Sequence, residues 1–197
     1  FIFDVNTANA GTASNQFQLP LTYQGAISMD VDWGDGTTDT ITSYNQAETL
    51  HTYASSGIYT IEITNEVKGW NFPFPYVDNA KILDISNWGE FNFTNDWSFR
   101  NCPNLTCSAT DVPLISTTNM KFTFYACSSY NTDMSSWDFS SVANLDSFVR
   151  GCTVYNQPMN IDTSSVTRMV STFADCSAFD QDISGWDINQ VLYFSYF

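Results

Sequence analysis

The sequence is poor in positive charge. Its 197 residues include 6 Lys and Arg against 21 Asp and Glu, which gives a formal net charge of −15. A chain this acidic repels nucleic-acid phosphates and anionic lipid surfaces, so we expect no nucleic-acid partner. No apolar run approaches the roughly 18 residues of a membrane span, and the sequence therefore predicts no membrane insertion.

Histidine is also scarce, and this limits the chemistry. Any Ser-His-Asp or Cys-His arrangement would have to use His51, which is the only histidine and sits beside no candidate nucleophile. The sequence lacks a Cys-x-x-Cys pair and a glycine-rich phosphate loop, and one histidine does not make a typical zinc cluster with widely spread cysteines. We therefore expect no enzymatic activity, no metal and no cofactor.

Apolar residues, in contrast, are plentiful. Hydrophobic residues make up 43% and aromatic residues 16% of the chain, enough to build a core. Ser, Thr and Asn are abundant while Lys is rare, which is typical of an extracellular surface. The composition predicts a folded protein outside the cytosol.

The cysteines indicate an internal repeat in the second half of the chain. Four of the five recur at almost equal intervals: Cys102, Cys127, Cys152 and Cys176. A Phe precedes each of them by three or four positions, and a bulky apolar residue follows three positions later. Trp137 and Trp186 keep the same register, and Trp88 belongs to an earlier, degraded copy.

The apolar spacing within one repeat predicts a helix. Val166, Met169, Phe173 and Cys176 fall at i, i+3, i+7 and i+10, which is one face of a helix. Residues 183–188 favour an extended segment. A helix plus an extended piece is too small to fold alone, so we expect the repeats to stack into an α/β solenoid of about four to five units.

Two stretches, "SSWDFSSVANLDSFVRGC" and "FADCSAFDQDISGWDINQV", resemble the BspA-like surface-protein repeats. These are a leucine-rich-repeat-like class of about 25 residues per unit. The resemblance covers more than half of the chain. It implies a surface protein of a bacterium, protist or virus, often an adhesin and often without an assigned activity.

Two interpretations stay open for the cysteines and for the repeated Trp residues. The periodic cysteines could form a ladder of buried thiols or, in an oxidising compartment, disulfides. Cys107 lies outside the register, which leaves a Cys102–Cys107 bridge as an alternative. Trp88, Trp137 and Trp186 favour core positions, while exposed rings there would form a glycan-binding strip.

The first part of the chain follows a different pattern. Apolar and polar residues alternate in 27–33 and in 59–64, which predicts half-buried strands, and "FIFDV" and "FQLPL" add further short strands. Five or more strands in about 65 residues predict an all-β, immunoglobulin-like sandwich.

Two motifs in this part, "WGDGT" and "HTYASSGIY", resemble those of PKD domains, a family of immunoglobulin-like β-sandwiches. The resemblance covers residues 1 to about 65 and implies that the motif residues are mainly structural. These residues are Trp33, Gly34, Asp35, Gly36, His51, Tyr53, Gly57 and Tyr59.

The acidic loop around this motif has three interpretations. Asp35 between two glycines suits a tight turn, because its side chain can bond the amides of the turn and Gly accepts a positive φ. A calcium site at Asp32 and Asp35 is the alternative, although calcium needs about six oxygens. A catalytic carboxylate pair is the least favoured.

The sequence thus predicts two domains, a PKD-like β-sandwich over 1–67 and a BspA-like solenoid over 80–197. A Pro- and aromatic-rich junction over 68–79 joins them. We expect a non-enzymatic module on a cell or virion surface that binds a host-surface protein or glycan. The alternatives are a subunit that assembles with copies of itself into an extracellular filament or viral fibre, and a glycan-binding accessory domain of a larger enzyme.

Overall fold

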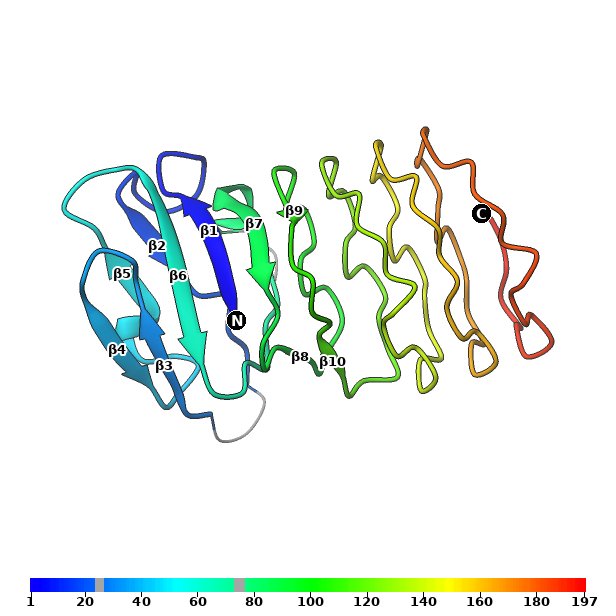
Figure 1. Cartoon of the computed structure of the whole chain (residues 1–197), viewed down its shortest axis with the longest axis horizontal. Coiled ribbons are helices and arrows are strands. Elements are labelled where there is room, and N and C mark those ends of the chain that lie inside the picture. The colour runs from blue at the N-terminus through cyan, green and yellow to red at the C-terminus, as the bar shows by residue number, and fades with distance from the viewer. Residues whose placement is uncertain (24–26, 73–76) are drawn as a thin grey trace.

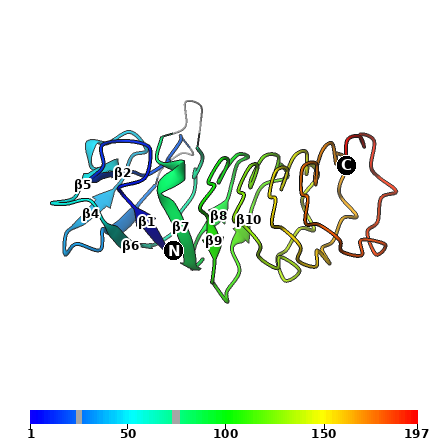
Figure 2. The ribbon, with the colours of Figure 1, turned by 90° about the horizontal axis from the view of Figure 1, so that it is seen from above.

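The computed structural model describes residues 1–23, 27–72 and 77–197. It is elongated: a β-sheet region at the N-terminal end passes into a row of stacked coils that ends at the C-terminus (Figures 1 and 2). Among the residues described, no helix has the length and hydrophobicity needed to cross a bilayer.

A six-stranded sheet forms the N-terminal end, with the strand order β4-β3-β6-β1-β7-β9. Its strands are β1 (Ile2–Asn6), β3 (Met29–Asp32), β4 (Thr38–Ile41), β6 (Ile58–Thr64), β7 (Ile82–Asn87) and β9 (Thr106–Cys107). The first five pair antiparallel, while β9 runs parallel to β7. The strands expected in 1–5, 27–33 and 59–64 are therefore present.

Two small sheets and two short 3-10 helices complete the regular structure. β2 (Gln16–Gln18) pairs antiparallel with β5 (Leu50–Thr52), and β8 (Asn92–Phe93) pairs parallel with β10 (Leu114–Ile115). The 3-10 helices are η1 (Ala47–Thr49) and η2 (Asn79–Lys81). The predicted immunoglobulin-like sandwich is wrong, because β2 and β5 form a separate two-stranded ladder instead of a second full layer that closes over the first sheet.

The predicted α/β solenoid is wrong as well. The described residues contain no α-helix, and beyond β10 the coils consist of turns joined by isolated parallel bridges. Val166, Met169 and Phe173 are buried as expected, but in turns: the amide of Cys176 donates to the carbonyl of Phe173 at 3.0 Å. A succession of such turns places an apolar residue inward at every third or fourth position, and this spacing imitates a helix.

Hydrogen bonds between neighbouring coils hold the stack together. In one ladder, Trp97 N donates to Lys121 O, Phe122 N to Asp146 O, and Ser147 N to Val170 O, at 2.8–3.1 Å. Each step advances by one sequence repeat, so the repeat is the length of one coil. Residues at the same repeat position therefore lie next to each other in neighbouring coils.

One hydrophobic core runs through the sheet region and the coils, from Phe1 to Cys176. Phe1 packs edge-on against Trp70 with ring centroids 5.3 Å apart, and Trp88 packs edge-on against Trp137 at 5.3 Å. β7 and β9 belong to the part predicted as solenoid, yet they extend the sheet that contains β1. The sheet and the core thus continue across the junction predicted at 68–79, of which residues 73–76 lie outside the described residues.

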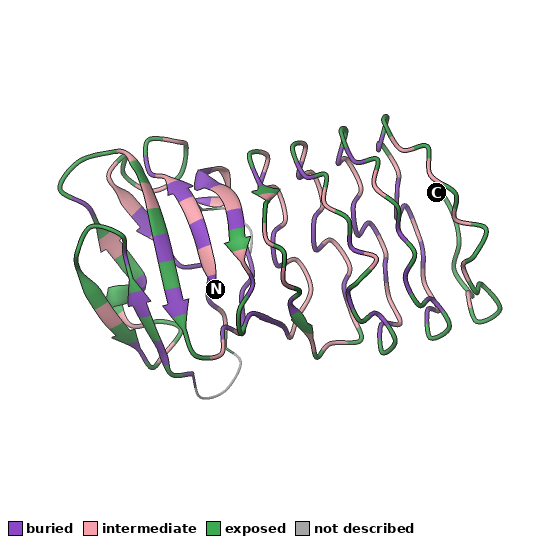
Figure 3. Cartoon of the chain, viewed as in Figure 1, coloured by how far each residue is buried: buried purple, intermediate pink, exposed green. Residues whose placement is uncertain are grey.

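Burial changes sharply at the last coil. The inner sides of the earlier coils are buried, whereas residues 177–197 are all intermediate or exposed (Figure 3).

Candidate functional site: a basic-aromatic ridge

The Trp-Gly-Asp-Gly motif forms the tight turn between β3 and β4. Asp35 Oδ1 accepts hydrogen bonds from the amide and the hydroxyl of Thr37, at 3.0 and 2.6 Å, and Oδ2 lies 2.9 Å from His51 Nε2. Gly34 and Gly36 have φ values of +78° and +89°, which other residues rarely adopt. Partial burial opposes ionisation of Asp35, but the hydrogen bonds from Thr37 and His51 outweigh it and lower its pKa.

The other motif residues pack behind this turn. The His51 ring stacks on Trp33 with centroids 4.6 Å apart, and the Tyr53 hydroxyl donates to the Trp33 carbonyl at 3.1 Å. Tyr53 in turn stacks on Tyr59 at 3.8 Å, and burial raises the pKa of Tyr53 well above its usual value. The amide of Gly57 donates to the hydroxyl of Thr7, just after β1, at 3.0 Å. The motif residues thus fasten this turn to its surroundings, except Gly36, which provides only a positive φ for the turn.

The geometry offers little to a calcium ion at this turn. Asp32 Oδ1 accepts from the Gly34 amide at 2.9 Å, and both oxygens of Asp35 have the partners given above. Asp32 also lines a shallow depression with Asp30 and Glu62. Within residues 1–23, 27–72 and 77–197, no three His, Cys, Asp or Glu side chains are placed to share a metal ion.

All five cysteines, which lie within the described residues, are free thiols. The four periodic ones are buried and three of them donate to a carbonyl of the preceding coil at 3.0 Å: Cys127 to Phe99, Cys152 to Phe124 and Cys176 to Val149. Cys107 is half-buried at the start of the coils. Burial raises the pKa of Cys107 and of Cys176 to about 11.

The repeated Trp residues line the inside of the coils. Trp88 and Trp137 are buried, and Trp186 is partly buried with its Nε1 donating to the Met159 carbonyl at 2.7 Å. Trp88 and Trp137 therefore contribute no exposed ring to the glycan strip considered above.

A different set of rings and cations lies together on the outside of the coils, and all of its members are half-buried. We name this set the basic-aromatic ridge: Trp97, Arg100, Lys121, Phe122, Tyr125 and Arg150. The Arg100 guanidinium lies 4.9 Å from the Trp97 ring centroid and 5.2 Å from those of Phe122 and Tyr125. Such cation–π contacts hold the charge and the rings in one arrangement.

The ridge extends to both sides of this centre. Lys121 Nζ lies 6.0 Å from the Trp97 ring and 3.3 Å from the carboxylate of Asp96. At the other end, Arg150 lies 5.9 Å from the Tyr125 ring and its Nε contacts Asp175 Oδ2 at 3.2 Å. Three of the six cations of the chain are thus gathered on one ridge, although the net charge is −15.

Five of the six ridge residues, all except Lys121, belong to two rows of equivalent positions along the stack. One row begins with Trp97 and the other with Arg100, and the hydrogen-bond ladders between coils align the members of each. In chain order the first row is Trp97, Phe122, Ser147, Ser171 and Tyr196, all with φ between +51° and +63°. The second row is Arg100, Tyr125, Arg150 and Ala174.

Small residues in both rows border a hollow. A cavity of about 360 Å³ opens where Ser171 and Ala174 take the positions that Phe122 and Tyr125 hold nearer the N-terminus. Arg150, Asp175 and Tyr196 line its sides. The hollow therefore continues the ridge toward the C-terminus.

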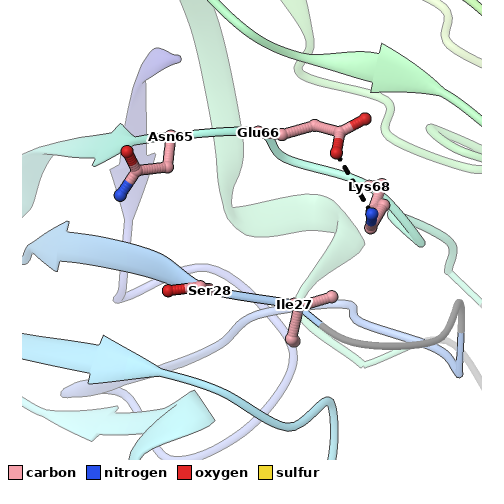
Figure 4. Close-up of a pocket in the computed structure, with 5 residues that line it drawn as sticks. All are labelled: Ile27, Ser28, Asn65, Glu66 and Lys68. Carbon is pink, nitrogen blue, oxygen red and sulfur yellow. Dashed lines mark hydrogen bonds and ion pairs between the residues drawn. The ribbon is translucent and has the colours of Figure 1, made fainter.

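A second depression, of about 440 Å³, lies in the sheet region and is lined by Ile27, Ser28, Asn65, Glu66 and Lys68 (Figure 4). Its charged groups satisfy each other: Lys68 Nζ lies 3.1 Å from Glu66 Oε2, and Asn92 Nδ2 donates to Glu66 Oε1 at 3.0 Å. Hydrogen bonds from Asn92 and Lys68 lower the pKa of Glu66. None of the described residues that line this depression is aromatic, which makes it the weaker candidate.

Sequence reasoning missed the ridge. Its signal was present, because Trp97 and Phe122 both stand five positions before a periodic cysteine, and Arg100, Tyr125 and Arg150 stand two positions before one. The apolar core residues define the repeat in the sequence, however, and the outward positions share no single residue type that would mark a surface.

A match to a known protein family lies within the coils. Residues 118–197 match the family described as "Mycoplasma protein of unknown function, DUF285". No curated protein and no solved structure matches the chain.

Proposed function

We propose that the chain is a non-enzymatic extracellular binding module of a cell or virion surface, and that the basic-aromatic ridge is its contact surface. The observation that carries the proposal is the position of Arg100 among the rings of Trp97, Phe122 and Tyr125. Aromatic residues and Arg are the residue types enriched in binding interfaces and in their energetic centres.

Two further considerations support an exterior location and a role in adhesion. The resemblance to BspA-like repeats implies a surface protein, and the ridge lies in the same repeat region, just before and within the stretches that carry that resemblance. Half-exposed rings that are already fixed by neighbouring cations lose little conformational entropy when a partner binds, because they are ordered beforehand.

The proposal is tested by binding of labelled protein to cultured cells, matrix proteins and glycan arrays. The critical variant is Phe122→Ser combined with Tyr125→Ala, which gives this coil the same residues that Ser171 and Ala174 provide two coils further on. Since the fold already accepts Ser and Ala at these row positions, we expect the variant to fold and to lose binding about tenfold or more. Glu48→Gln, on exposed η1, is the control and should bind as the unchanged protein does.

If the unchanged protein binds none of these surfaces, or if the double variant binds as well as the control, the ridge is not a contact surface.

A second candidate function is assembly of copies head to tail into a filament. The observation that favours it is the exposed apolar surface of the last coil, with side chains of Ile188, Leu192, Tyr193, Phe194, Tyr196 and Phe197. At the opposite end of the molecule, β4 is an edge strand of the six-stranded sheet (Figure 1). Two different complementary ends produce open, heterologous assembly.

The mass in solution and negative-stain electron microscopy test this candidate. Filaments that disappear in Leu192→Asp combined with Phe194→Asp would support assembly through the last coil. Monomers at micromolar concentration, or filaments that persist in this variant, would contradict it.

A further inference from the structure

We propose that the hollow at Ser171 and Ala174 is a carbohydrate subsite that takes an uncharged pyranose ring. This inference rests on the proposed binding function and names a ligand class for one part of the ridge. It starts from the row positions: the first two coils of the rows present Trp97 and Arg100, and Phe122 and Tyr125, and the next presents Ser147 and Arg150. The coil of the hollow presents only the hydroxyl of Ser171 and the methyl group of Ala174.

The backbone at the hollow keeps the regular geometry of the first row. Ser171 has a φ of +57°, which equals that of Phe122, and Ser171 N donates to Ser195 O as Phe122 N donates to Asp146 O. The main chain is therefore in the conformation that carries a ring elsewhere in the row. The small side chains of Ser171 and Ala174 border a cavity of about 360 Å³, within the range of about 300–1,000 Å³ that is typical of small-molecule pockets.

The walls of the hollow combine a ring with polar groups. Tyr196 comes from the following coil and Arg150 from the preceding one, two coil spacings of about 4.8 Å apart, or roughly 10 Å. The Tyr196 ring offers an apolar face to the C–H groups of a sugar. Ser171 Oγ, the Asp175 carboxylate and the Arg150 guanidinium offer both donors and acceptors to sugar hydroxyls.

Arg150 retains hydrogen-bonding capacity for a ligand. In the described part of the chain its guanidinium donates one hydrogen bond, from Nε to Asp175 Oδ2 at 3.2 Å. Its side chain is 41% exposed and that of Asp175 is 68% exposed. The terminal nitrogens of Arg150 and the second oxygen of Asp175 therefore remain for a ligand.

The charge balance favours an uncharged sugar over an acidic one. Asp175 neutralises Arg150 within the hollow, so that the site has no net charge of its own. The chain as a whole carries −15, which repels uronic acids, sialic acids and sulfated sugars. A neutral sugar ring with several hydroxyl groups can pair with the donors and acceptors of the hollow, and the negative charge of the chain does not repel it.

The test is nuclear magnetic resonance of the whole protein titrated with neutral methyl pyranosides and short neutral oligosaccharides, with glucuronic acid and sialic acid as charged counterparts. For at least one neutral sugar we expect saturation transfer to the ligand and shifts in the amides of Ser171, Ala174 and Tyr196. Affinity should change less than twofold between 50 and 500 mM salt, because an uncharged ligand is not screened.

The critical variant is Ser171→Phe, which fills the hollow with the side chain that Phe122 places at the equivalent position. Ser129→Phe is the matched control, since Ser129 is exposed and lies outside both rows. We expect Ser171→Phe to weaken binding at least tenfold and Ser129→Phe to leave it unchanged. Asp175→Asn, at a side chain that is 68% exposed, should weaken binding several-fold and provides a second test if Ser171→Phe fails to fold.

Three results would overturn the inference. Sugar binding unaffected by Ser171→Phe and Asp175→Asn would place the sugar elsewhere. Stronger binding of the acidic sugars, with a marked salt dependence, would contradict the ligand class. Binding to proteins or cells through the ridge, with no neutral sugar bound at the hollow, would remove the subsite and leave the proposed function standing.

Discussion

Lys81 Nζ lies 3.2 Å from Asp78 Oδ1, and neither side chain has any exposure to solvent. Both groups have several further partners in the loop between β1 and β2 and in β2 itself. Asp78 accepts from the backbone amides of Thr12 and Gln18, at 2.7 and 2.6 Å. Lys81 donates to backbone carbonyls of the same segment, at 2.7–3.3 Å: Thr12, Ala13 and Gln16. This pair therefore fastens the first loop to the segment that leads into the coils.

Replacement of Lys81 by Met should be strongly destabilising. The Asp78 carboxylate would stay buried without its cation, and breaking one side of a buried pair costs about 3–5 kcal/mol. Urea unfolding followed by Trp fluorescence measures the loss in the free energy of unfolding.

Lys68→Met is the matched control for this prediction. Lys68 also pairs with a nearby carboxylate, at 3.1 Å from Glu66, but this pair is partly exposed and should contribute less than about 1 kcal/mol. Equal losses in the free energy of unfolding of the two variants would show that burial does not make the Lys81–Asp78 pair more important for stability than an exposed pair.

The two glycines of the β3–β4 turn should respond differently to alanine. Gly36 has open space around its Cα, so Gly36→Ala meets only the strain of a positive φ, about 1–2 kcal/mol. A Cβ on Gly34 would collide with the backbone carbonyl of Thr60, which adds about 1–3 kcal/mol for displaced packing. Thermal unfolding of the two variants compares them directly, and a larger loss for Gly36→Ala would contradict this order.

The sequence predicted structure correctly where the motif and the contacts that determine its conformation lie within a few neighbouring residues. The Trp33–Gly36 turn and strands β1, β3 and β6 follow from alternation and turn chemistry over a few neighbouring residues. The repeat period was visible in the cysteines, and it is the period of the coils. These features need no knowledge of what lies opposite in space.

The secondary structure of the repeat was not predictable from its apolar spacing. Met169, Phe173 and Cys176 are spaced like one face of a helix, but a chain of turns gives nearly the same spacing. Positive φ values at Ser171 and Asp175 are incompatible with a helix. The residue types Ser and Asp do not by themselves predict a positive φ.

The candidate site depends on neighbours that the sequence does not reveal. Arg100 meets Phe122 and Tyr125 only because the coils stack in register. Lys81 is buried, although lysine usually prefers solvent. The sequence does not show this burial, because the residues that surround Lys81 lie about 65 to 70 positions earlier in the chain.

Replacement of Cys152 by Ser tests the ladder of buried thiols. Cys152 Sγ donates to Phe124 O at 3.0 Å from an apolar stack, where a smaller and more polar hydroxyl fits less well. We expect a loss of about 1–3 kcal/mol in the free energy of unfolding. Cys107→Ser, at a half-buried position outside the periodic ladder, should cost less. No difference between these variants in urea unfolding would contradict a structural role for the ladder.

Alkaline pH should destabilise the coils before the tyrosines ionise. Burial raises the pKa of Cys107 and Cys176 from 9.0 to about 11, and it also raises the pKa of Cys127 and Cys152. Between pH 9 and about pH 11 the unfolded chain loses thiol protons that the folded chain keeps, so unfolding is favoured as the pH rises. The stability is fully present below about pH 9 and is lost progressively above it.

Urea unfolding in the presence of a reductant, at pH 8.0, 9.0 and 9.5, measures this dependence below the ordinary pKa of tyrosine, about 10. The control is Cys152→Val, which removes one of the buried thiols and keeps an apolar side chain in its place. This variant should lose less stability than the unchanged protein between pH 8.0 and 9.5, because one proton fewer is released on unfolding. An identical slope in both proteins would mean that Cys152 ionises as readily in the folded chain as in the unfolded one, and it would contradict the burial of its thiol.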